Sequence, residues 1–439
     1  QRPLVIFAGH APAHNYAANT YPFRAASNYL YFGGPPLEHA ALCIEPESDG
    51  AAGCTLLRPV AGPDDVLWTG APPDDADLAT AAGLPESALA PPERLAALVS
   101  RRATAGIVPL RPGAMAQAAE LKLAAPIAEE LQAIIDLRLI KDDHELAALR
   151  FAAQVSMDAH RAALGAAMPG GREADAAADF ASVLVANDCR PAFTPIITVR
   201  GEVLHGAGYG NTLLEGALLL VDAGAEEPGG YASDITRTVP IGGRWSAPQR
   251  QLYEIVLRAN QAATAACRPG RRFREVHYLT ARAIAAGLAD AGLLRGQPDE
   301  IVARNAHALF FPHGLGHLIG LDVHDMEDFG DLAGYAPGRS RPAEFGAKFL
   351  RLDRDLAPGM CVTIEPGIYL VPTIWQRADL VGPVADLVNR DAVDELLEDN
   401  FGGIRIEHTV CVRDADGPEV LTADLPTDAD RVAELVPQA

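Results

Sequence analysis

The pattern of hydrophobic and polar residues changes near residue 135 of this chain. Before it, short apolar runs at residues 3–9, 28–34 and 103–110 are separated by turn-forming stretches rich in Pro, Ala and Asp. This spacing predicts short strands alternating with short helices, and hence an α/β domain. From about Ile127 to Ala166 the pattern becomes helical, and Asp142 followed by Glu145 predicts a capping box. We therefore expect two domains, 1–138 and 139–439.

Two segments of the second domain share a weak repeat, residues 148–184 and 251–284. In each, two helical patterns flank a Pro-Gly break, Pro169-Gly170 in one and Pro269-Gly270 in the other. The segments are either two unrelated helical hairpins or the two halves of a duplicated, pseudo-symmetric domain. The second interpretation places a functional site where the halves meet.

A strong hairpin signal lies at residues 216–243, where an apolar run enters a Pro-Gly-Gly turn and leaves through a β-branched segment. The midpoint between Asp222 and Asp234 falls on Pro228, inside this turn. A regular ladder would place the two carboxylates directly opposite each other, with Cβ atoms about 5 Å apart. Such a pair favours a bound cation. The alternative is that one aspartate caps a turn.

Further polar residues occur in unusual surroundings downstream. His313, His317 and His324 lie within twelve residues, between glycines that allow close approach of the backbone. Glu365 ends an apolar strand, where an unpaired carboxylate would be costly. Strand alternation places Arg405 and Glu407 on one face, where they could also form a simple ion pair.

Together these segments supply four carboxylates and one imidazole, a ligand set suited to two hard or borderline divalent cations. Four negative charges and two doubly charged ions leave room for a bridging hydroxide, which is the outline of a hydrolase centre. The predicted metal ligands are Asp222, Asp234, His317, Glu365 and Glu407.

Charge and cysteine usage restrict the partners. With 36 basic and 58 acidic residues the net charge is −22, which disfavours binding to nucleic acid and anionic membranes. No apolar run approaches the ~20 residues of a membrane span. Six scattered cysteines without a CxxC pair predict buried thiols in a reducing compartment. We expect a cytoplasmic protein.

Residues 140–425 resemble the creatinase-like catalytic domain of the aminopeptidase P and prolidase family. The matching phrases are ASDITRT, HGLGH, DVHD, EPGIY and GIRIE. YPFRAASNYLYF and VLWTG resemble the N-terminal domain of aminopeptidase P, which methionine aminopeptidases normally lack. The resemblance implies an α/β (α+β) fold, with a pseudo-symmetric pita-bread catalytic domain and a smaller α/β N-terminal domain.

The resemblance also implies roles for the residues. Asp222 would chelate one metal, Asp234 and Glu407 would bridge both, and His317 and Glu365 would complete the second site. The metals are expected to be manganese, with zinc or cobalt as alternatives. A metal-activated hydroxide would then attack the Xaa-Pro bond of peptides with proline at position two.

Other matching residues are expected to handle protons and substrate. Glu365 is expected to shuttle protons, and His313 and His324 to hold substrate and stabilise developing charge. The candidate substrate-binding residues are His205 and Tyr369 beside the proline, together with Arg405 and Arg351.

Two activities remain open within this family. The N-terminal domain favours aminopeptidase P action on longer peptides. Arg351, in a prolidase-like phrase, favours a strict dipeptidase that grips the free proline carboxylate, unless it is a plain surface arginine. A non-catalytic peptide-binding module and hydrolysis of organophosphate-like esters are more distant alternatives. By analogy we expect a homodimer or homotetramer, with Trp68 either at the subunit interface or in the core.

Overall fold

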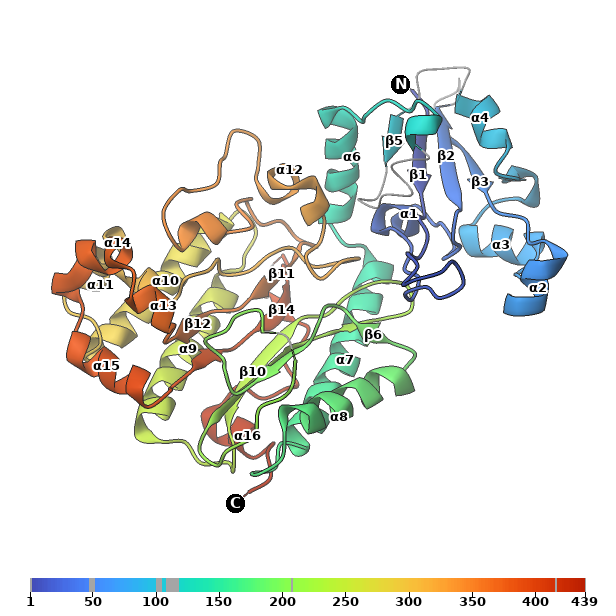
Figure 1. Cartoon of the computed structure of the whole chain (residues 1–439). Helices are drawn as coiled ribbons and strands as arrows, with labels where there is room; N and C mark the ends of the chain where they lie inside the picture. Colours follow the sequence, from blue (N-terminus) through green and yellow to red (C-terminus); the bar gives the residue numbers. More distant parts are fainter. Residues whose placement is uncertain are drawn as a thin grey trace. The chain divides into compact units, whose positions relative to one another are not determined.

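The computed structural model describes residues 2–46, 52–99, 105–107, 118–206, 208–414 and 417–438 (Figure 1). The chain forms two compact units, Gln1–Ile134 and Ile135–Ala439, divided within helix α6 (Ala128–Leu139). In the described ranges no helix has the length and apolarity needed to cross a membrane.

The first unit is a mixed five-stranded sheet in the order β4-β3-β2-β1-β5. Its strands are β1 Leu4–Phe7, β2 Ala41–Pro46, β3 Ala52–Leu57, β4 Leu89–Ala90 and β5 Ala105–Ile107. Its helices are α1 Ser27–Tyr31, α2 Pro63–Thr69, α3 Asp75–Ala82 and α4 Arg94–Val99. The predicted α/β alternation is confirmed. Of the predicted run 103–110, only residues 105–107 are described, and they form β5.

The second unit carries the two predicted helical hairpins, α7 Asp143–Gly165 with α8 Glu173–Ala186, and α9 Ala247–Ala266 with α10 Phe273–Asp290. Asp142 and Glu145 form the expected capping box of α7. Gly170 and Gly270 both adopt positive φ, 86° and 78°. Each then donates its N–H to a downstream backbone carbonyl, Leu213 or Leu356. This shared geometry favours a duplication over two unrelated hairpins.

The remaining elements of this unit are short. The helices are α11 Pro298–Ala303, α12 Asp331–Gly334, α13 Pro372–Trp375, α14 Ala378–Val381, α15 Arg390–Glu398 and α16 Ala429–Ala433. The first group of strands comprises β6 Arg190–Pro191, β7 Ile196–Thr198, β8 Leu218–Ala223, β9 Ala225–Glu226 and β10 Ile235–Pro240. The second comprises β11 Cys361–Ile364, β12 Gly367–Tyr369, β13 Gly403–Arg405, β14 His408–Cys411 and β15 Glu419–Val420. The main ladders are β10-β8-β7 and β11-β14-β15, with β12-β13 and β6-β9 as separate pairs.

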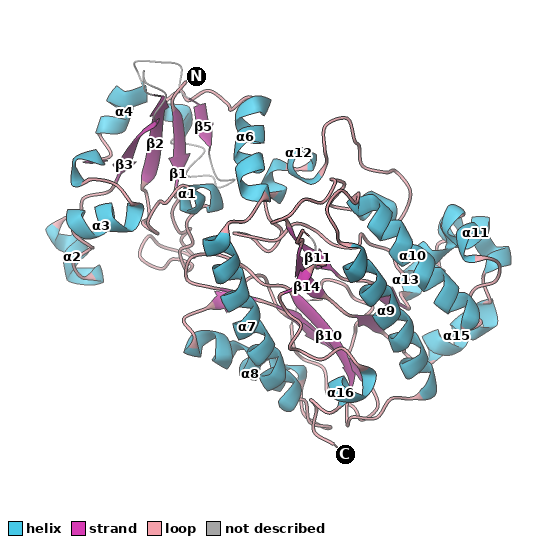
Figure 2. Ribbon diagram, turned by 180° about the vertical axis from the view of Figure 1, so that it is seen from behind, coloured by secondary structure: helices cyan, strands magenta, loops and turns pink. Residues whose placement is uncertain are grey.

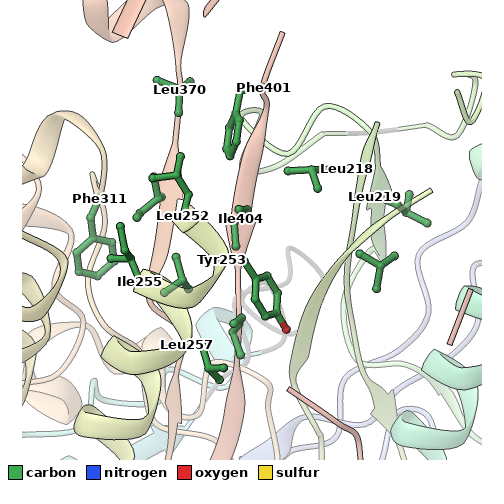
Figure 3. Packing of buried hydrophobic residues seen from close by; sticks show 14 of the residues in the cluster. Leu218, Leu219, Leu252, Tyr253, Ile255, Leu257, Phe311, Leu370, Phe401 and Ile404 are labelled. Atoms are coloured by element: carbon green, nitrogen blue, oxygen red, sulfur yellow. The ribbon is translucent and has the colours of Figure 1, made fainter. Parts of the chain in front are cut away.

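Helices cover the strands of this unit. Figure 2 shows β10, β11 and β14 between the α7–α8 pair and the α9–α10 pair. In the core, Leu252 and Ile255 of α9 belong to one buried cluster with Leu218 of β8 and Ile404 of β13 (Figure 3). Burial of each such side chain contributes roughly 2 kcal/mol. The packing fixes strands whose ends carry the polar residues singled out above.

The predicted hairpin is confirmed as β8 and β10, but its predicted register is wrong. Asp222 pairs with Thr236 rather than with Asp234, and the Glu226–Ala232 bridge keeps the same register. The turn is therefore centred on Gly229 rather than Pro228. Asp234 lies one diagonal step from Asp222, on the same face of the ladder.

Gly224 makes this close approach possible. A Cβ at residue 224 would lie only 1.7 Å from the carbonyl oxygen of Ser233, which directly precedes Asp234. We expect Gly224→Ala to lower the free energy of unfolding by about 3 kcal/mol, because a backbone atom must move. Urea unfolding would measure this loss. Gly210→Ala is the control, because a Cβ there meets nothing within 4 Å. Equal stability of the two variants would contradict the prediction.

A second ladder aligns the two glutamates. The pairs Ile364–His408 and Gly367–Arg405 keep one register across the gap between β11-β14 and β12-β13. Glu365 and Glu407 therefore stand opposite each other. The strand alternation predicted around Arg405 and Glu407 is interrupted between β13 and β14, where the Glu407 N–H donates to the Thr236 carbonyl of β10. This bond links the second ladder to the first.

Candidate metal centre

Three of the five predicted ligands form one compact group. Asp234, His317 and Glu407 place ligand atoms within 4.8 Å of one another, and all three residues are buried. Asp234 directly precedes β10, and Glu407 directly precedes β14. Both ladders thus contribute a carboxylate, as expected of a site between two structural halves.

His317 presents an unprotonated nitrogen to this group. Its Nδ1–H donates to the Leu318 carbonyl at 2.9 Å, and its backbone N–H donates to Thr363. Burial lowers the pKa of His317 to about 4, so the ring is neutral at pH 7. Its Nε2 lone pair then lies 3.4 Å from Asp234 Oδ2. Two acceptors at this separation fit a cation between them.

The carboxylates are crowded and incompletely partnered. Burial raises the pKa of Asp234 and of Glu407 well above the ordinary range. Repulsion by Asp222 raises the pKa of Asp234 further, and repulsion by Asp234 raises that of Glu407. Asp234 Oδ1 and Glu407 Oε1 are buried without a hydrogen-bond partner among the described residues. Buried charges of this kind are normally paired or coordinate metals. The residues present fit divalent cations with mostly oxygen ligands.

Asp222 and Glu365 border the compact group. Asp222 Oδ2 accepts a hydrogen bond from the Arg405 guanidinium. Glu365 Oε1 lies 3.8 Å from His317 Nε2, and burial raises the pKa of Glu365. The structure thus brings all five predicted ligands to one site, with Asp222 held by an arginine.

Arg405 is buried and connects several of these groups. Its Nε donates to Thr236 Oγ1 at 3.0 Å, and that hydroxyl donates to Glu407 Oε2 at 2.7 Å. The alternative of an Arg405–Glu407 ion pair is therefore wrong, because Arg405 pairs with Asp222 instead.

A cavity of about 710 Å³ opens onto the carboxylates. This volume is typical of sites for small ligands and short peptides. Predicted site residues that line it are Asp222, Asp234, His317, Glu365, Glu407, His205, His313, His324, Arg351 and Arg405. Aromatic and aliphatic side chains cover much of the remaining wall.

Tyr369 departs from the expectation of direct substrate contact. It is fully buried, and it is not among the described residues that line the cavity. Its hydroxyl accepts from Arg405 Nη1 and donates to His313 Nε2, both at 2.9 Å. His313 Nδ1–H donates to Gly314, and burial lowers the pKa of His313 to about 3. Tyr369 therefore fixes the neutral His313 ring from behind.

His324 packs on His317, with ring centroids 3.9 Å apart. Its Nδ1–H donates to Glu327 Oε2 at 3.1 Å, and the His317 ring and burial lower the pKa of His324. Arg351 Nη1 donates to the same Glu327 oxygen at 2.6 Å. Arg351 lines the cavity and keeps 40% of its side chain exposed, so its role in holding substrate stays a prediction.

Several residues of this site were not predicted from the sequence. Thr236 lies within the quoted ASDITRT phrase, and Glu327 directly follows the DVHD phrase and Met326. Both residues lie in or beside the motifs quoted above, but a single hydroxyl or carboxylate in a sequence does not by itself indicate a functional role. The missed aromatic wall residues are Phe193, Phe345 and Phe349.

Comparisons with known proteins agree with this arrangement. Residues 147–414 match the model of metallopeptidase family M24, and residues 1–101 match the N-terminal domain of aminopeptidase P. The human Xaa-Pro dipeptidase is 37% identical over 298 residues, which cover 66% of this chain and 58% of that protein. A probable Xaa-Pro aminopeptidase of Paracoccidioides lutzii is 31% identical, covering 94% of this chain and 88% of its own.

Solved structures give the same result over nearly the whole chain. Proline aminopeptidase P II from Yersinia pestis has a TM-score of 0.80 and 28% identity, covering 99% of this chain and 94% of its own. Aminopeptidase P from E. coli with the inhibitor Pro-Leu has a TM-score of 0.80, 27% identity, and 99% and 93% coverage. The expected fold class is confirmed. This chain belongs to metallopeptidase family M24 and combines its pita-bread catalytic fold with an aminopeptidase P N-terminal domain.

Proposed function

We propose that this protein is a metal-dependent exopeptidase that hydrolyses the Xaa-Pro bond at the N-terminus of peptides. The observation that carries the proposal is the compact group Asp234, His317 and Glu407 in the wall of a cavity of about 710 Å³. In this group Asp234 Oδ1 and Glu407 Oε1 are buried without a hydrogen-bond partner among the described residues. The names of similar proteins, which include Xaa-Pro aminopeptidases and dipeptidases, support proline specificity. In this proposal residues 139–439 form the catalytic domain.

Two divalent cations would be held by the five ligands. Asp222 would bind one ion, Asp234 and Glu407 would bind both, and His317 and Glu365 would complete the second site. When bound, the ions supply Lewis acidity to the scissile carbonyl and lower the pKa of the attacking water. We propose manganese because the set is rich in oxygen and free of sulfur. Zinc is the alternative, since one similar structure is a zinc-substituted E. coli aminopeptidase P with product.

The other residues would orient substrate and move protons. Glu365 is more exposed than the other ligand carboxylates, with 19% of its side chain exposed against 12% for Asp222, so it is best placed to exchange protons. His313 and His324 present neutral rings to the cavity, which can contact a proline ring without the cost of desolvating a charge. His205 lines the same cavity and completes this wall.

Peptide length separates the two candidate activities. The aminopeptidase proposal rests on matches that span both units, whereas the human dipeptidase matches over 66% of the chain. Mass spectrometry of products from Ala-Pro, Ala-Pro-Ala and a longer Xaa-Pro peptide, with manganese-loaded protein, tests this directly. We expect release of the first residue from all three. Cleavage of Ala-Pro alone would make the protein a strict dipeptidase, and cleavage of none would favour a binding module.

Location and assembly are separate proposals. The six cysteines are all free thiols, five of them buried, which supports a reducing compartment such as the cytoplasm. Trp68 is 83% exposed, so the core-packing alternative for it is wrong. Its exposure on α2 supports the subunit interface of a homodimer or homotetramer. Analytical ultracentrifugation of wild-type protein and Trp68→Ala would test that role.

A further inference from the structure

Glu327 contacts two candidate substrate-binding residues of the cavity wall, Arg351 and His324. One of its oxygens, Oε2, accepts from Arg351 Nη1 at 2.6 Å and lies 3.1 Å from His324 Nδ1. Arg351 and His324 both line the cavity that opens onto the candidate metal ligands. The carboxylate therefore lies where it can modify the charge that a substrate meets.

The backbone holds Glu327 in this position at some cost. Met326, the preceding residue, is fully buried and adopts φ +62°, a region that non-glycine residues rarely occupy. A 3₁₀ turn follows at Glu327–Phe329. Glu327 Oε1 is buried without a hydrogen-bond partner in the described part of the chain. An incompletely paired carboxylate that directly follows a left-handed backbone residue, next to two residues of the cavity wall, points to function.

Glu327 is also the nearest counter-charge of Arg351. The neighbouring cation Arg341 has its own carboxylate, Asp331, and also donates to the Leu350 carbonyl. Burial would raise the pKa of Glu327, but the hydrogen bond and the electrostatic effect of His324, followed by the charge of Arg351, lower it to about 2, so Glu327 is ionised at neutral pH. Glu327 thus offsets most of the positive charge that Arg351 presents to the cavity.

This pairing bears on peptide length. The free carboxylate of an Xaa-Pro dipeptide would gain from a guanidinium through charge-assisted hydrogen bonds. Here one guanidinium nitrogen is already occupied, and the charge of Glu327 offsets most of the attraction. A longer peptide places a neutral amide at the same point, so the Arg351–Glu327 ion pair lowers its binding affinity little.

Building on the function proposed above, we propose that Glu327 sets peptide-length specificity by holding Arg351, so that the site accepts longer Xaa-Pro peptides as readily as dipeptides. Glu327 is a specificity-determining residue in this account. Arg351 becomes a strong carboxylate clamp only when the Glu327 charge is removed.

The test compares Ala-Pro with its amide, Ala-Pro-NH2, because the two differ only in the terminal charge. For wild-type protein and Glu327→Gln, kcat and KM are measured on both substrates with manganese. We expect Glu327→Gln to raise the ratio of kcat/KM for the acid over the amide by about tenfold, mainly through KM. In the double variant with Arg351→Gln, this rise should disappear.

Several outcomes would overturn the inference. If Glu327 only orients His324, Glu327→Gln will lower kcat on both substrates equally and leave the ratio unchanged. A rise that persists in the double variant would exclude Arg351 as the mediator. Glu419→Gln is the matched control, because Glu419 pairs with Arg150 and Arg413 outside the cavity and should leave the ratio unchanged. Wild-type protein that cleaves neither substrate would instead refute the proposed function, and the inference with it.

Discussion

Glu407→Gln is expected to lower kcat on Ala-Pro-Ala by about 1000-fold or more while the fold stays intact. Glu407 is buried, and its two carboxylate oxygens have different surroundings. Oε2 accepts from Thr236, whereas Oε1 has no partner in the described chain and is available to a cation. Glutamine keeps the shape and the bond to Thr236 but loses the charge, so the variant isolates metal binding from packing.

The stability of the same variant provides an independent check. Burial and the nearby Asp234 disfavour the ionised form of Glu407, so removing the charge relieves repulsion in the metal-free protein. We expect an unchanged or higher free energy of unfolding without metal, measured by urea titration. Glu419→Gln, a surface pair, should change neither quantity. Glu407→Gln with activity within tenfold of wild type would sink the assignment of this residue as a ligand.

Metal is expected to raise the melting temperature of chelator-treated protein by about 10 °C at pH 8, and by much less at pH 5. Asp234 and Glu407 have ordinary pKa values of 3.8 and 4.5, and both are raised in the folded protein. Above about pH 4 the metal-free folded chain therefore binds more protons than the unfolded chain. The contribution of these groups to stability is lost as the pH rises toward the raised folded pKa.

A bound cation takes the place of those protons, so the stabilisation by metal should grow with pH. Buried histidines act with the opposite sign. The folded pKa of His277 is lowered by burial from 6.5 to about 3, so its contribution to stability is lost as the pH falls below 6.5. Differential scanning calorimetry with and without manganese at each pH separates the two effects. An equal shift at pH 5 and pH 8 would contradict the crowded-carboxylate description.

Local signals in the sequence predicted the elements well. The Asp142–Glu145 capping box and the β8–β10 hairpin rest on contacts between near neighbours in the chain, and the paired Pro-Gly breaks rest on the local backbone conformation of glycine. The ligand set was recognisable because each member stands in a distinctive phrase. Four carboxylates in apolar surroundings predict a shared cation at the place where the fold brings them together.

Features that depend on tertiary packing could not be predicted from the sequence. The hairpin register follows the turn centred on Gly229, and no residue pattern distinguished this from Pro228. Tyr369 lies behind His313 because β12 pairs with β13, which turns its side chain into the core. The contact of Glu327 with Arg351 joins residues 24 positions apart through a left-handed Met326. These contacts follow no periodic pattern of residues, so the sequence pattern could not predict them.

Metal dependence together with proline specificity tests the central claim most directly. Protein treated with a chelator and then restored with manganese would be offered Ala-Pro-Ala and Ala-Ala-Ala in parallel, with released alanine measured in each. The proposed function predicts no release before manganese is added, and release afterwards from Ala-Pro-Ala but not appreciably from Ala-Ala-Ala. Release that survives chelation, or equal cleavage of the two peptides after manganese, would contradict it.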